Sequence, residues 1–235
     1  MIDILAISPH PDDAEIGCGG LLLASKKRAY KTGILHLTLG EMGTGGDEEI
    51  RKKEIDNAAR LLELDYVNIV GFKDCQITDS HENRLLIAEY IRKLKPKIVL
   101  IPYWTAVPGR GIGHTDHLTT GIMASHAVNF ARLHKMPIEG EPHSVQQVLY
   151  YLFPRDTMPS LVVDITHVAN QWLKAIKSHH SQMFGKHAKQ NRFYEMIVSS
   201  AKTMGYQIRA RYGQGFVSAS PLNIPDPFVL IDKAK

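Results

Sequence analysis

Short runs of aliphatic and β-branched residues alternate with longer helical patterns along the first two-thirds of this chain. The short runs predict strands at residues 2–7, 34–39, 66–70 and 97–102. The longer segments predict helices at residues 20–31, 48–64, 83–94 and 116–134. Strands that alternate with crossover helices form parallel sheets with right-handed connections. A strand order of 3-2-1-4 would place the ligand crevice between the first and fourth strands.

The last third of the chain is less regular. It predicts strands at residues 145–153 and 161–165, helices at 169–183 and 190–204, and short strand-like pieces at 216–217 and 228–231. We find no internal repeat and no flexible linker, and a length of 235 residues suits one α/β domain. The predicted fold is therefore a doubly wound, mainly parallel, Rossmann-like α/β sheet flanked by helices. Its core covers residues 1–135, and residues 136–235 form a C-terminal αβ elaboration.

The composition argues against several classes of protein. The net charge is +4 with scattered basic residues, whereas a nucleic-acid-binding surface needs them clustered. The chain has two cysteines, Cys18 and Cys75, without a CxxC pair, so we expect no disulfide framework and a cytoplasmic location. The N-terminus lacks the basic start of a signal peptide, and no apolar run approaches the ~20 residues of a membrane span. We therefore expect neither a nucleic-acid partner nor a membrane association.

Two clusters of histidine and aspartate follow strands that this topology makes neighbours. His10, Asp12 and Asp13 come after the first strand, and the run His-Thr-Asp-His at 114–117 follows the fourth strand and its loop. A hydrolytic zinc site needs three imidazole or carboxylate ligands and an open position for water. It also needs a carboxylate outside the ligand set to accept the proton of that water. Each cluster alone could be a capped helix start, but together they predict a metal-dependent hydrolase.

Two other features have structural explanations. Gly17, Gly19 and Gly20 follow a strand, but a dinucleotide-binding G-x-G-x-x-G pattern would need glycine at position 22, which is leucine. Close packing of a helix on the sheet explains these glycines better. The histidines outside the two clusters, including His36 and His179, are assigned to the core or the surface.

The sequence His-Pro-Asp-Asp-x-Glu, followed later by His-x-Asp-His, resembles the LmbE/PIG-L family of zinc-dependent N-acetylglucosamine deacetylases. The resemblance extends along nearly the whole chain. It implies His10, Asp13 and His117 as the metal ligands, with Zn²⁺ as the ion or another divalent ion such as Fe²⁺. The implied substrate is a small N-acetylated amino sugar.

The same resemblance implies roles for the other residues of the two clusters. Asp12 would be the general base. His114 would stabilise the oxyanion or protonate the leaving amine, and Asp116 would orient His114 through a hydrogen bond. Members of the family are often hexameric, so a homo-oligomer, such as a hexamer, is expected.

Within the family, the chain is most similar to the deacetylases of bacillithiol biosynthesis, which act on N-acetylglucosaminyl malate. The similarity lies in the glycine-rich loop 40–46, in Arg51 followed by Glu54, and in residues 212–216. Arg51 resembles a family arginine near the substrate, and its guanidinium would suit a carboxylate or sugar hydroxyls. The alternative is that Arg51 is a solvent-facing helix residue.

The chain also departs from this pattern. Many relatives carry Arg-His-Pro-Asp-His, where this chain has Gly113 and Thr115 beside its histidine. The loop 105–112 is longer and is similar to that of mycothiol-type members, which have a tyrosine where this chain has Ile112. A deacetylase for another N-acetyl amino sugar and a mycothiol-type amidase therefore stay open as alternatives.

Two alternatives lie outside deacetylation. A metal phosphoesterase usually assembles two metals and more ligands than this sequence offers. A metal-containing sugar-binding module would have no need for the second, non-ligand aspartate, Asp12.

Overall fold

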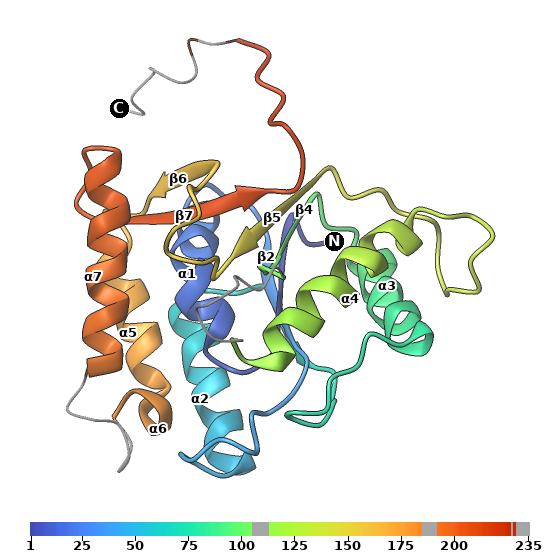
Figure 1. The fold of residues 1–235 in the computed structure, drawn as a ribbon, viewed down its shortest axis with the longest axis horizontal. Coiled ribbons are helices and arrows are strands. Elements are labelled where there is room, and N and C mark those ends of the chain that lie inside the picture. Colours follow the sequence, from blue (N-terminus) through green and yellow to red (C-terminus); the bar gives the residue numbers. More distant parts are fainter. Residues whose placement is uncertain (105–112, 185–191, 227, 229–235) are drawn as a thin grey trace.

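A computed structural model describes residues 1–104, 113–184, 192–226 and 228 of the protein. Within this part of the chain, seven strands form one sheet in the order β3-β2-β1-β4-β5-β7-β6 (Figure 1). The strands are β1 (Ile4–Ser8), β2 (Thr32–His36), β3 (Tyr66–Ile69), β4 (Ile98–Pro102), β5 (Gln147–Tyr151), β6 (Leu161–Asp164) and β7 (Gly213–Ser218). β1 to β5 pair in parallel, whereas β7 pairs antiparallel with both β5 and β6. The predicted mainly parallel α/β sheet is confirmed, and its first four strands have the order 3-2-1-4 for which the crevice was expected between β1 and β4.

Helices cover both faces of this sheet (Figure 1). They are α1 (Asp13–Lys26), α2 (Glu48–Leu61), α3 (His81–Leu94), α4 (Thr115–Ala131), α5 (Ala169–Ser178), α6 (His180–Met183) and α7 (Arg192–Gln207). On one face α1 and α7 pack on the sheet, and α5 packs between α1 and α2. On the other face α3 packs against α4.

β1 shows how the sequence builds a core on each face. Ile4 and Ala6 belong to the apolar cluster that includes α1, α5 and α7, whereas Leu5 and Ile7 belong to the cluster that includes α3 and α4. Side chains of a strand point alternately to the two faces of a sheet. A central parallel strand must therefore be apolar at every position, which is why the first run predicts a buried strand.

The first helix begins earlier than expected. It starts at Asp13 instead of residue 20 and ends at Lys26 instead of residue 31. The glycines that weaken the helical pattern are required by packing, as predicted. A Cβ on Gly17 would overlap the ring of Tyr151, and one on Gly20 would lie 2.7 Å from Cδ1 of Ile165.

The C-terminal elaboration also differs from the expectation in detail. The single helix expected at 169–183 is two helices, because His179, with φ −77° and ψ 54°, leaves the helical conformation. The short strand expected at 216–217 is part of the longer β7. The strand expected at 228–231 lies, apart from residue 228, outside the described residues.

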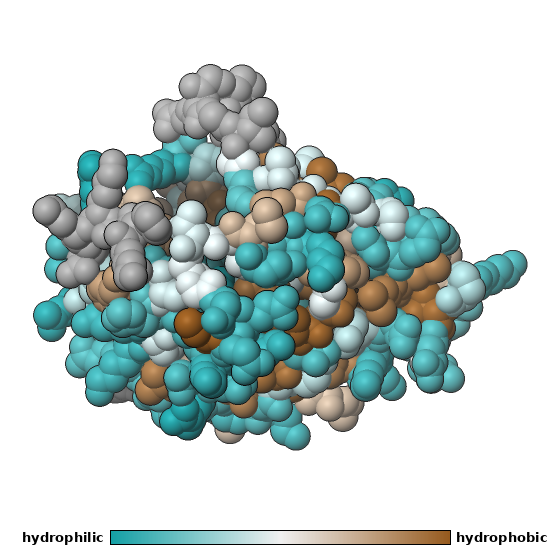
Figure 2. Space-filling model, turned by 90° about the horizontal axis from the view of Figure 1, so that it is seen from below, coloured by the Kyte–Doolittle hydropathy of each residue, from teal (hydrophilic) through white to brown (hydrophobic). Residues whose placement is uncertain are grey.

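Hydrophilic residues cover most of the face of the molecule shown in Figure 2, with smaller hydrophobic areas between them. None of the helices in the described ranges has the length and apolar character that a membrane span requires.

Candidate active site

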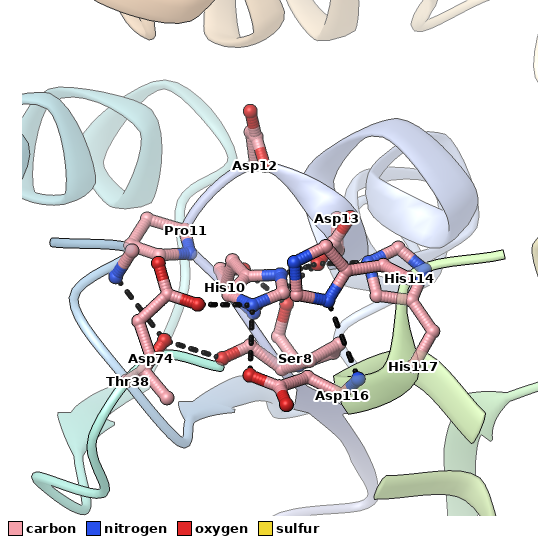
Figure 3. Close-up of polar contacts among 12 residues, drawn as sticks. Ser8, His10, Pro11, Asp12, Asp13, Thr38, Asp74, His114, Asp116 and His117 are labelled. Atoms are coloured by element: carbon pink, nitrogen blue, oxygen red, sulfur yellow. Dashed lines mark hydrogen bonds and ion pairs between the residues drawn. The ribbon is translucent and has the colours of Figure 1, made fainter. Parts of the chain in front are cut away.

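The two predicted clusters meet at the carboxyl ends of β1 and β4, which are neighbours in the sheet (Figure 3). His10, Asp12 and Asp13 follow β1 directly, and Asp13 is the first residue of α1. His114 precedes α4, and His117 lies in its first turn. The rings of His10 and His114 are in edge contact, with centroids 4.6 Å apart. The convergence expected from the topology is therefore present in the structure.

The three residues predicted as metal ligands lie together, because both histidines are next to the same carboxylate oxygen of Asp13. Oδ2 of Asp13 lies 3.0 Å from Nδ1 of His10 and 3.1 Å from Nε2 of His117. Donor atoms around a tetrahedral zinc ion are roughly 3.3 Å apart, given zinc–ligand distances of about 2.0 Å. Burial would raise the pKa of Asp13, but His117 and His10 lower it far below its ordinary range. Two imidazole nitrogens and an ionised carboxylate are a donor set that suits a divalent ion such as zinc.

The far side of the His10 ring faces two further carboxylates. Nε2 lies 3.0 Å from Oδ1 of Asp74 and 3.3 Å from Oδ2 of Asp116. Burial would lower the pKa of His10, but hydrogen bonds and charge from Asp13, Asp74 and Asp116 together raise it to about 9. When Nε2–H donates to a carboxylate, the lone pair of Nδ1 is available on the Asp13 side, as in carboxylate–histidine–metal arrangements. A divalent cation bound here would neutralise the negative charge of these carboxylates.

Asp116 has different partners from those expected. Its carboxylate was predicted to orient His114, but it accepts the backbone N–H of Cys75 at 2.8 Å and faces His10. The contact with His114 comes from the backbone, because the N–H of Asp116 donates to Nδ1 of His114 at 3.3 Å. His114 thus caps α4, and because its Nδ1 is the acceptor, Nε2 is the ring nitrogen that can carry a proton. That nitrogen is 3.8 Å from Sγ of Cys75 and can donate a hydrogen bond.

Asp12 stands apart from the ligand cluster. Its side chain points away from the histidines in Figure 3, and its backbone has a φ of +104°, a conformation that residues other than glycine rarely adopt. Burial and the nearby charge of Asp13 raise the pKa of the Asp12 carboxyl to about 7. A carboxylate with such a pKa is suited to taking and returning a proton near neutral pH.

Arg51 lies in α2 and is neither solvent-facing nor open to a ligand, since the residue is 2 % exposed. Its Nη2 donates to the carbonyl of Pro11 at 2.6 Å and its Nε to the carbonyl of Leu39 at 3.3 Å. Its Nη1 is 3.8 Å from Oε2 of Glu54. The guanidinium therefore lies beneath the segment that carries Asp12 and supports its backbone.

Sequence reasoning gave no role in the site to four buried polar residues near this centre, Glu15, His36, Asp74 and His179. Asp74 follows β3 and also accepts the backbone N–H of Met42 from the glycine-rich loop at 3.0 Å. Its place beyond the third strand, at the same edge of the sheet, is the only signal that pointed to it. His36 and His179 were assigned to the core or the surface; they are fully buried and face Glu15, at 3.6 and 3.2 Å.

Comparisons with known proteins identify the family of this chain. The family model described as GlcNAc-PI de-N-acetylase (PIG-L) matches residues 5–128. A diacetylchitobiose deacetylase of Thermococcus kodakarensis is 34 % identical, over 76 % of this chain and 69 % of its own length. A probable N-acetyl-α-D-glucosaminyl L-malate deacetylase 2 of Bacillus subtilis is 27 % identical, over 77 % of this chain and 84 % of its own. The conserved protein TT1542 of Thermus thermophilus is 36 % identical in sequence. Its crystal structure superimposes with a TM-score of 0.87, covering 96 % of this chain and 98 % of that one.

Proposed function

Because the chain belongs to the PIG-L family of deacetylases, we propose that it hydrolyses the acetamide of an N-acetylglucosamine derivative in a metal-dependent reaction. The products would be acetate and a free amine. The observation that carries the proposal is the convergence of His10, Asp13 and His117 beside Asp12, a carboxylate outside the ligand set.

His10 through Nδ1, Asp13 through its carboxylate and His117 through Nε2 would hold the metal ion. A divalent ion bound by them would lower the pKa of a water molecule and polarise the carbonyl group under attack. We take zinc as the ion and Fe²⁺ as the alternative, since ligands of this type accept both.

Asp12 is the proposed general base. Its raised pKa, about 7, lets the ionised carboxylate accept a proton from the water that attacks the acetamide carbon. The same proton is then available for the nitrogen that leaves when the carbon–nitrogen bond breaks. The carboxylate thereby returns to its ionised form, and the proton balance closes.

His114 is the proposed donor to the carbonyl oxygen as negative charge develops on it. Its Nδ1 accepts the backbone N–H of Asp116, so Nε2 is the nitrogen that can donate a hydrogen bond. A preorganised donor of this kind contributes most when the oxygen becomes an anion. Asp116 then acts on His10 instead of His114, by holding the Nε2 side of the ligand ring.

Two substrates are the best candidates. N-acetylglucosaminyl malate is supported by the loop 40–46, by Arg51 with Glu54, and by the similarity to the Bacillus relative. Diacetylchitobiose is supported by the higher identity to the Thermococcus relative. Burial of Arg51 beneath Pro11 weakens its proposed role as the group that reads the malate carboxylate. We retain the cytoplasmic location and a homo-oligomer as proposals that rest on composition and on the family resemblance.

The test is release of free amine from a panel of acetamides by the purified protein, with and without a chelator. The panel comprises N-acetylglucosaminyl malate, diacetylchitobiose, N-acetylglucosamine and a mycothiol precursor, with p-nitrophenyl phosphate for the phosphoesterase alternative. We expect amine release that a chelator abolishes and added Zn²⁺ or Fe²⁺ restores, and none from an Asp13→Ala variant. Binding of these sugars without hydrolysis would favour a binding module, and hydrolysis of the phosphate ester alone would favour a phosphoesterase.

A further inference from the structure

Asp12 needs support from its surroundings, because its backbone lies in a conformation that an aspartate rarely adopts. Its φ is +104°, and it stands between Pro11 and the first residue of α1. Such a conformation persists only where neighbouring groups hold it, and it is often found where a reactive side chain must be aimed.

Two buried side chains hold this backbone by hydrogen bonds. Oε2 of Glu15 accepts the N–H of Asp12 at 3.2 Å. Nη2 of Arg51 donates to the carbonyl of Pro11 at 2.6 Å. Glu15 is 1 % exposed, so its second carboxylate oxygen also needs a partner within the protein.

That partner comes from the far end of the sequence. Nε2 of His179 lies 3.2 Å from Oε1 of Glu15, and the residue is fully buried at the break between α5 and α6. His36 is the next nearest imidazole, with Nε2 at 3.6 Å from the same oxygen, beyond hydrogen-bonding distance. We propose that His179 is a positioning residue that fixes the backbone of Asp12 through Glu15. This inference rests on the proposed function, in which Asp12 is the general base.

The residues next to His179 support the other side of Asp12. Ser181 donates from its backbone N–H and from its hydroxyl to the two oxygens of Glu54, at 2.7 and 2.8 Å. Glu54 lies 3.8 Å from Nη1 of Arg51. Gln182 donates to the carbonyl of Gly45 at 2.6 Å and so ties down the glycine-rich loop. This short segment of the C-terminal elaboration therefore contacts Glu15 directly and reaches Arg51 through Glu54.

The break between α5 and α6 makes the contact of His179 with Glu15 possible. A continuous helix through residue 179 would carry the following residues along the axis of α5, whereas the break lets His179, Ser181 and Gln182 all face the catalytic half. The contact between His179 and Glu15 spans 164 positions in the sequence, and no local pattern predicts it.

The test uses two neutral amides that differ by one methylene. Gln at position 179 can place its amide N–H where Nε2 lies, whereas Asn is too short to reach Glu15. We expect His179→Gln to stay within a few-fold of the wild type in kcat. His179→Asn should lower kcat on the order of 10²-fold, as a 1 Å misplacement of a catalytic group does, with KM and metal content unchanged. The matched control is His180→Gln, since His180 is the exposed neighbour.

Amide hydrogen exchange gives a readout that does not require turnover. The N–H of Asp12 should exchange faster in His179→Asn than in the wild type, in His179→Gln or in His180→Gln. Should the Asn variant not fold, Glu15→Gln breaks the link from its other end and should raise the same exchange rate.

Three results would overturn the inference: full kcat in His179→Asn, equal losses in the Asn and Gln variants, or unchanged exchange at Asp12. A failure of the proposed function is distinguishable, because it shows as a wild type that hydrolyses no acetamide. The exchange comparison still decides in that case whether His179 holds the Asp12 backbone.

Discussion

Replacing Glu15 by glutamine tests how much the buried carboxylate beneath Asp12 stabilises the fold. Burial would raise the pKa of Glu15, but the charges of His36 and His179 lower it from an ordinary value of 4.5 to about 2. Each pKa unit corresponds to about 1.36 kcal/mol, so the ionised form stabilises the folded state by roughly 3 kcal/mol. We therefore expect the wild type to exceed Glu15→Gln in free energy of unfolding at pH 6 by at most about this amount, since glutamine resembles the protonated acid and burial lowers the pKa of His36.

The sign of the pH dependence follows from linkage. Because the pKa of Glu15 is depressed in the folded protein, its contribution is present above pH 4.5 and is lost as the pH falls towards 2. The loss should reach about 1 kcal/mol at pH 4 and about 2 kcal/mol at pH 3. Burial would lower the pKa of His179, but the charge of Glu15 raises it above 6.5. The contribution of this pair is therefore present below pH 6.5 and is lost as the pH rises through the folded pKa of His179.

The assay is urea unfolding of metal-free protein from pH 3 to pH 8, so that the titration is that of the protein groups alone. The wild type, Glu15→Gln and a control, Glu139→Gln at an exposed position, are compared at each pH. The stability difference between wild type and Glu15→Gln should be largest between pH 4.5 and 6.5, and the control should follow the wild type throughout. A difference that stays constant from pH 6 to pH 3 would refute the reasoning.

Three further predictions concern the site. Asp13→Ala and His117→Ala should each abolish retention of a divalent ion in elemental analysis, and full occupancy in both would contradict the ligand assignment. Asp12→Asn should keep the ion and lose at least ~10²-fold in kcat, the usual worth of a positioned base; His114→Ala should also keep it and lose on the order of 10²–10³-fold. Near-normal turnover in steady-state assays of either would contradict its role. Arg51→Ala should lower kcat on every acetamide, because its guanidinium is buried on backbone carbonyls; a higher KM for the malate substrate alone would mean that it binds the carboxylate.

The sheet and the place of the site could be predicted because both depend on short-range patterns. Apolar runs of strand length alternate with helical segments, and this alternation determines a parallel sheet. The carboxyl ends of parallel strands lie on one edge, so motifs that follow β1 and β4 meet once these strands are neighbours. The proximity of His10 and His117 could be predicted for that reason, although they are far apart in sequence.

The direction of a side chain could not be predicted in the same way. The carboxylate of Asp116 was expected to form a hydrogen bond with His114. It instead contacts His10 and accepts the backbone N–H of Cys75, because it points back from the first turn of α4 towards the sheet. The start of α1 was misplaced because glycines at 17, 19 and 20 are poor helix formers. Glycine is required there by tertiary packing, since Tyr151 and Ile165 occupy the space that a side chain at Gly17 and Gly20 would need.

Residues of the C-terminal elaboration help to position the helix that carries part of the site. Gln214 of β7 accepts the backbone N–H of Leu21 and donates to the carbonyl of Ile16, so it fixes α1 in two places. Trp172 of α5 donates from its indole to the carbonyl of Glu15 at 2.8 Å. The N-terminus of α1 carries Asp13, and these contacts set its position from outside the first half of the chain. The ligands and the base come from the first half of the chain, but their relative placement depends on residues that lie more than 150 positions after the α1 residues they contact.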